Sequence, residues 1–68
     1  MTRTQFIVTM AIHIAERGGI TAARALPIAA RAYHAFADDN RIAFGDPGFA
    51  WDRAAASIVA TEYEIACW

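Results

Sequence analysis

Few side chains in this sequence could do chemistry, and none stands beside an obvious partner. The only histidines are His13 and His34, and the only cysteine is Cys67. His34 and Asp38 are four residues apart, so on a helix they would share one face and could share a hydrogen bond or a metal ion. Because neighbours on a helix often form such pairs by chance, we expect a solvated surface pair and predict no metal site.

Catalysis has no better candidate. An active site needs a nucleophile or acid–base group with a positioned partner. His13 belongs to the polar stripe of an otherwise apolar segment, which predicts a surface or interface histidine. Cys67 has no adjacent base or helix N-terminus that would favour a reactive thiolate. Gly18-Gly19 is typical of a helix cap rather than of a phosphate-binding loop. The sequence therefore predicts a protein that is not an enzyme and that holds no cofactor.

Length and charge restrict the classes of function further. The chain has 68 residues, which predicts a single domain over residues 1–68. It is 57% hydrophobic, and six basic residues face seven acidic ones, for a formal net charge of −1. A non-specific nucleic-acid binder normally carries a basic excess. A single cysteine excludes an internal disulfide and favours a reduced intracellular thiol.

Neither a membrane span nor a secretion signal is expected. The longest uncharged apolar run, residues 6–15, is about half the length that a bilayer requires. It is similar to the hydrophobic part of a signal peptide, but Glu16 and Arg17 follow where small residues would mark a cleavage site. The expected location is the cytoplasm of a bacterial host.

The elements that would position these side chains are mainly helices. Thr2 and Gln5 form a capping box, which predicts a helix to about Arg17, ended by Gly18-Gly19. Thr21 can cap a short helix over residues 22–26. Pro27 suits the first turn of a third helix, which would run to about Ala37.

The chain beyond residue 40 gives the only β signal. Residues 41–44 and 49–52 flank Gly45-Asp46-Pro47-Gly48, which predicts a β-hairpin with its large apolar residues brought together over the helices: Ile42, Phe44, Phe49 and Trp51. Asp52 can cap a last helix from Arg53 to about Ala66, with a strand over residues 61–68 as the alternative. The fold class predicted is a mostly α domain of about four helices with one short hairpin.

The polar stripes of the long helices are narrow. They comprise Gln5, Thr9, His13 and Glu16 in the first, Arg31, His34 and Asp38 in the third, and Arg53, Ser57, Thr61 and Glu64 in the last. Three such helices present more apolar surface than one small core needs, which predicts a homodimer through the first and last helices. The alternative is that alanine, and not large apolar residues, covers the helix faces that lie outside the core.

The order helix, short helix, tight turn, helix and hairpin resembles a winged helix-turn-helix. Residues 22–28, AARALPI, are similar to the turn of such domains, with Pro27 where glycine is usual, and residues 36–51 resemble the end of the recognition helix plus the wing. This resemblance implies a small DNA-binding transcriptional regulator. The corresponding helix offers only Arg31 and His34 to DNA, and Asp38 would repel phosphate.

Residues 37–46, ADDNRIAFGD, resemble a segment of the small phage-borne anti-CRISPR proteins that inhibit type I surveillance complexes. This resemblance implies a non-enzymatic inhibitor that occupies a surface of the CRISPR effector. We therefore favour a phage or mobile-element protein that binds a host protein complex, with the DNA-binding regulator as the alternative. The partner-binding residues predicted are the polar groups of the third helix and the hairpin: Arg31, His34, Asp38, Asp39 and Arg41.

Overall fold

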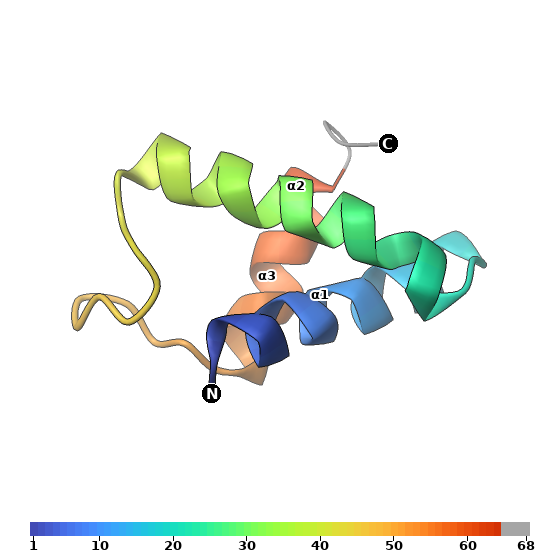
Figure 1. Cartoon of the computed structure of the whole chain (residues 1–68), viewed down its shortest axis with the longest axis horizontal. Coiled ribbons are helices and arrows are strands. Elements are labelled where there is room, and N and C mark those ends of the chain that lie inside the picture. Colours follow the sequence, from blue (N-terminus) through green and yellow to red (C-terminus); the bar gives the residue numbers. More distant parts are fainter. Residues whose placement is uncertain (65–68) are drawn as a thin grey trace.

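The computed structural model describes residues 1–64, which form three α-helices and no strand. Helix α1 (Arg3–Gly18) and helix α2 (Ala22–Asn40) run side by side in opposite directions (Figure 1). Helix α3 (Arg53–Tyr63) lies behind them and contacts both. The prediction of a mostly helical domain is confirmed, but the predictions of about four helices and of a hairpin are wrong.

The predicted cap of α1 is confirmed. The backbone N–H of Gln5 donates to Thr2 Oγ1 at 3.1 Å, and the backbone N–H of Thr2 donates to Gln5 Oε1 at 2.8 Å. At the other end Gly19 adopts φ 67°, and its N–H donates to the Ala15 carbonyl at 3.0 Å. Glycine takes this left-handed conformation without a Cβ clash, so the helix ends at Gly18.

Helix α2 corrects the predicted division at Pro27. Thr21 caps it as expected, its Oγ1 accepting from the N–H of Arg24 at 3.1 Å, but the helix then continues through Pro27 without a turn. Proline removes the hydrogen bond to the carbonyl four residues earlier and its ring crowds that turn, but the rest of the ring here is exposed. Burial of Ala25, Ile28 and Ala29 on both sides of Pro27 holds the helix together.

The end of α2 also differs from the prediction. The helix runs to Asn40 instead of Ala37, because Asn40 Nδ2 donates back to the Phe36 carbonyl at 2.9 Å. Arg41 then turns the chain with φ 54°, and the N–H of Ile42 donates to the Ala37 carbonyl at 3.1 Å. With one continuous helix and no wing in residues 1–64, the winged-helix order predicted from the sequence is wrong.

Pro27→Ala is expected to raise the free energy of unfolding by about 1–3 kcal/mol. Alanine restores the missing backbone donor and removes the clash of the ring with the preceding turn. Urea unfolding followed by circular dichroism measures the change. A lower stability for this variant would show that the proline ring makes a contact that matters more than the helix hydrogen bond.

Residues 41–52 form a series of turns in place of the predicted hairpin. The N–H of Asp46 donates to the Ala43 carbonyl at 3.1 Å and that of Phe49 to the Asp46 carbonyl at 3.2 Å, so these groups bond locally and not across two strands. Trp51 Nε1 also donates to the Asp46 carbonyl, at 3.1 Å. The segment folds this way because its aromatic rings turn onto the helices.

Those rings complete an aromatic core around Phe6. The Phe6 ring contacts Tyr33, Phe44 and Trp51 edge to face, with centroids 6.2, 6.1 and 5.2 Å away. The four apolar residues of the predicted hairpin pack on the core as expected, although no strand carries them: Ile42, Phe44, Phe49 and Trp51. The aromatic side chains therefore determine the path of this segment.

Alanine forms much of the rest of the core. The buried alanines come from all three helices: Ala11, Ala25, Ala29, Ala32, Ala56 and Ala60. Small side chains let helices approach closely, so these alanines form part of the contacts among the three helices. The large side chains buried most completely are Phe6, Met10 and Ile14, all on α1. Helix α1 is thus the centre of the domain.

Helix α3 begins where the sequence predicts. Asp52 Oδ1 accepts from the N–H of Ala55 at 2.8 Å, which confirms it as the N-cap. The helix includes Thr61 to Tyr63, so the alternative of a strand is wrong for these residues. The predicted continuation to Ala66, and Cys67, lie outside the described residues.

Candidate functional site

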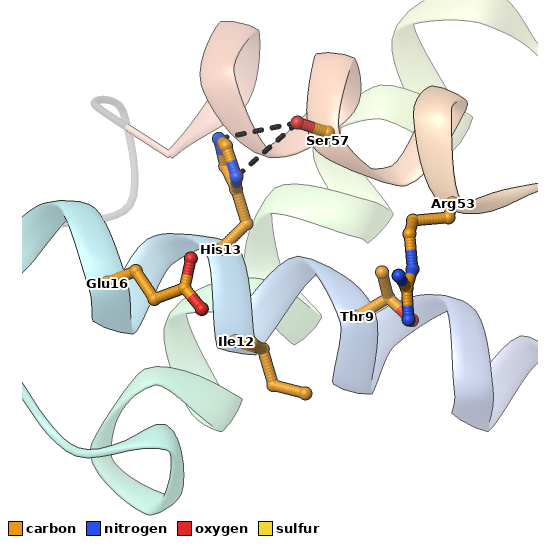
Figure 2. Close-up of a pocket in the computed structure, with 6 residues that line it drawn as sticks. All are labelled: Thr9, Ile12, His13, Glu16, Arg53 and Ser57. Atoms are coloured by element: carbon orange, nitrogen blue, oxygen red, sulfur yellow. Dashed lines mark hydrogen bonds between the residues drawn. The ribbon is translucent and has the colours of Figure 1, made fainter.

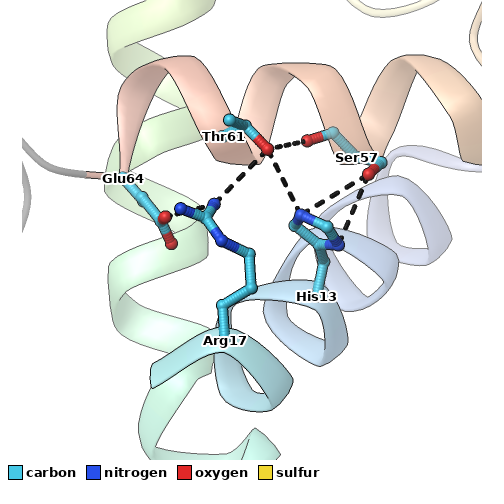
Figure 3. Close-up of polar contacts among 5 residues, drawn as sticks. All are labelled: His13, Arg17, Ser57, Thr61 and Glu64. Atoms are coloured by element: carbon cyan, nitrogen blue, oxygen red, sulfur yellow. Dashed lines mark hydrogen bonds and ion pairs between the residues drawn. The ribbon is translucent and has the colours of Figure 1, made fainter.

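The polar stripes of α1 and α3 face each other and form a seam between the two helices (Figure 3). His13 lies at its centre, half-buried. Its Nε2 lies 3.2 Å from Thr61 Oγ1, and Ser57 Oγ lies 3.3 Å from Nδ1 and 3.5 Å from Nε2. The sequence predicts both stripes but not their meeting, because these residues are 44 and 48 positions apart.

The hydrogen bonds of the seam determine the tautomer of His13. Thr61 Oγ1 donates to the Ser57 carbonyl at 2.9 Å, so its only proton is already used. The His13 Nε2 must therefore carry the proton and donate to Thr61, which leaves Nδ1 as the acceptor for the Ser57 hydroxyl. We assign this tautomer from the network of partners.

The seam continues to an ion pair between Arg17 and Glu64. Arg17 Nη1 pairs with Glu64 Oε1 and also donates to Thr61 Oγ1 at 3.3 Å (Figure 3). The Glu64 side chain is only 5% exposed, whereas that of Arg17 is 43% exposed. Within residues 1–64 the other carboxylate oxygen of Glu64 is buried without a hydrogen-bond partner. The sequence does not predict this pair, since nothing local links residues so far apart.

The His13–Ser57 contact does not have the geometry of a nucleophile and its base. Ser57 Oγ is almost equally distant from both ring nitrogens, so its bond to Nδ1 is not directed along the lone pair of that nitrogen. A catalytic histidine is normally oriented by a carboxylate that stabilises its charged form. Here a threonine hydroxyl takes that place, and the same hydroxyl binds the positive guanidinium of Arg17. The arrangement is suited to joining two helices.

A groove runs along the outer side of the seam (Figure 2). Its volume is about 300 Å³, and its lining comes from both helices: Thr9, Ile12, His13, Glu16, Arg53 and Ser57. Figure 2 shows Glu16 and Arg53 on opposite sides of this hollow, with Ile12 between them. The groove therefore has one acidic end, one basic end and a middle in which the exposed Ile12 lies beside polar side chains.

The predicted partner-binding residues are not gathered at this groove. Arg31, His34 and Asp38 are exposed and share the face of α2 that points away from the core. Asp39, also exposed, is bound by the Tyr63 hydroxyl, and Arg41 forms the turn after the helix. The structure therefore brings three of the five onto one surface and uses the other two at the end of α2.

The end of α2 is joined to α3 through Tyr63. Its hydroxyl donates to Asp39 Oδ2 at 2.8 Å and accepts from Asn40 Nδ2 at 3.3 Å. The hydrogen bond to Asp39 raises the pKa of Tyr63 above its ordinary value of 10.0, with desolvation acting in the same direction. The neutral phenol is thus the form that the folded protein favours.

Stability is expected to fall at alkaline pH partly through Tyr63. The folded pKa is raised, so the contribution of this group is complete below about pH 10, the unfolded value, and is lost as the pH rises through the folded value. The chain contains no lysine, so few other groups titrate in this range. Urea unfolding from pH 8 to pH 11 should show a smaller decline for Tyr63→Phe than for the wild type. Equal declines would contradict the assignment.

Other kinds of site find little support in residues 1–64. No three histidine, cysteine, aspartate or glutamate side chains of this part are placed to hold a metal ion together. None of its helices combines the length and apolar character needed to cross a membrane. Comparison of the chain with protein-family models, with curated proteins and with solved structures gives no match.

Proposed function

We propose that this protein is a non-catalytic inhibitor that binds a host protein complex through the outward face of α2. The observation that carries the proposal is the exposure on that face of Arg31, His34 and Asp38, which mix both signs of charge. Surfaces of mixed charge favour a protein partner whose charges are complementary. The segment that resembles anti-CRISPR proteins, residues 37–46, adjoins this face and suggests a type I CRISPR effector as the partner.

The same face is poorly suited to DNA. Asp38 lies at its C-terminal end, where it would repel phosphate, and the formal net charge of the chain is −1. The continuous α2 also lacks the tight turn that sets a recognition helix into the major groove. These observations support a protein partner over the DNA-binding alternative.

The proposal includes the cellular setting and the assembly predicted from the sequence. The protein acts in the cytoplasm of a bacterial host, as the product of a phage or mobile element, and works as a homodimer. A dimer would present the outward face of α2 twice, which increases the apparent affinity where both copies engage one effector.

Binding to a purified type I CRISPR effector tests the proposal. The wild type should co-elute with the effector in gel filtration, and the double variant Arg31→Glu/Asp38→Arg should bind at least about tenfold more weakly, because reversed charges oppose the partner's surface. The matched control is Glu62→Arg, which reverses an exposed charge on α3 and should bind as the wild type does.

Two results would overturn the proposal. One is the absence of association with any effector subunit at micromolar concentration. The other is retardation of duplex DNA with a steep dependence on salt, lost on Arg31→Ala and Arg24→Ala, which would establish the DNA-binding alternative.

A further inference from the structure

The groove between α1 and α3 has a pattern of charge that fits a second copy of itself. Arg53 stands on one side of the hollow and Glu16 on the other (Figure 2). A twofold axis through the middle of the groove exchanges its two ends. The basic end of one copy would then face the acidic end of the other, twice in the same interface.

Apolar side chains support the middle of such an interface. Ile12 lines the groove and is 46% exposed, and Val8, one turn earlier on α1, is 39% exposed. An aliphatic centre flanked by polar and charged groups is the usual arrangement of a protein–protein contact. On a twofold axis near Ile12, this side chain would pack against its own equivalent.

We propose that this groove is the interface of a homodimer, in which Arg53 of each copy pairs with Glu16 of the other across a contact between the Ile12 side chains. The inference rests on the homodimer of the proposed function and assigns its surface. It uses none of the residues of the outward face of α2, so binding to an effector can be measured independently. Nucleic acid is a poorer occupant, because Glu16 would oppose it.

Charge reversal tests the pairing directly. Glu16→Arg places two positive charges opposite each other at both contacts of the dimer. Arg53→Glu places two negative charges opposite each other at both contacts. Each variant alone should self-associate at least about tenfold more weakly than the wild type.

Mixing the two variants should restore association as a heterodimer. At one contact the positive charge introduced by Glu16→Arg faces the negative charge introduced by Arg53→Glu. At the other contact the unchanged Arg53 of the first variant faces the unchanged Glu16 of the second. Sedimentation equilibrium with one variant labelled measures both the loss and the restoration.

These substitutions are compatible with folding. Glu16 lies in the last turn of α1, where a positive charge suits the helix dipole, and Arg53 opens α3, where a negative charge does. Circular dichroism should show unchanged helix content. With unchanged helix content, a loss of self-association cannot be attributed to an unfolded chain.

A second pair of variants tests the apolar centre. Ile12→Asp should abolish self-association, whereas Leu26→Asp, a change to a similarly exposed residue on α2, should leave it unchanged. A wild type that remains monomeric at all concentrations, or single variants that fail to form a heterodimer when mixed, would overturn the interface. Binding of that monomer to the effector would still support the inhibitor.

Discussion

Phe6→Ala is expected to remove a large part of the stability of the domain. The Phe6 side chain is fully buried, and three aromatic rings contact it from α2 and from the segment before α3. Removing a buried phenylalanine costs about 3–5 kcal/mol. A domain of this length has a total stability of roughly 3–10 kcal/mol, from about 0.05–0.15 kcal/mol per residue. The loss therefore amounts to between about a third and all of the total stability.

The measurement is the helical signal at 222 nm during urea unfolding. Leu26→Ala is the matched control, since Leu26 is 40% exposed and lies outside the proposed dimer interface, and its change should stay within about 0.5 kcal/mol. A Phe6→Ala variant as stable as this control would show that the aromatic cluster does not hold residues 41–52 onto the helices.

Arg17→Met is expected to lower the free energy of unfolding by about 2–3 kcal/mol. The substitution keeps an apolar stem but leaves the Glu64 carboxylate, which is 5% exposed, without its cation. Breaking a buried ion pair from one side typically costs about 3–5 kcal/mol, and the value is reduced here because Arg17 is 43% exposed and partly screened by water. Loss of the Arg17–Glu64 ion pair would separate α1 from α3 at the end of the seam.

Removing the unpaired charge of Glu64 should restore part of the stability that Arg17→Met loses. The double variant Arg17→Met/Glu64→Gln is expected to be more stable than Arg17→Met alone, because a neutral amide is less costly to bury than a carboxylate. Arg24→Met, at an exposed position of α2, is the control for loss of an arginine and should change little. If the double variant were the less stable of the two, the buried charge would not be the cause.

The beginnings of the helices were predictable because each depends on residues three positions apart. Thr2, Thr21 and Asp52 each accept a hydrogen bond from a backbone N–H in the first turn of the helix that follows. Such signals need no knowledge of the rest of the chain. The exposure of Arg31, His34 and Asp38 followed in the same way from helical periodicity.

The path of the chain between α2 and α3 was not predictable by the same means. Gly45-Asp46-Pro47-Gly48 is typical of a hairpin turn, and the flanking residues have the alternation of strands. In the structure Trp51 contacts Phe6 and also Phe36, with ring centroids 5.2 and 6.3 Å apart. Burial of these rings against helices outweighs the backbone hydrogen bonds that a short isolated hairpin would gain.

The sequence by itself determined where α1, α2 and α3 begin, that each has a narrow polar stripe, and that no obvious catalytic pair is adjacent along the chain. Tertiary structure alone decided that α2 continues through Pro27, that residues 41–52 form turns, and that the stripes of α1 and α3 meet around His13. The physical reason is the separation along the chain over which each kind of interaction acts. Caps and periodicity act within one or two turns, whereas the seam joins residues 44 and 48 positions apart, and only packing of the whole chain brings those together.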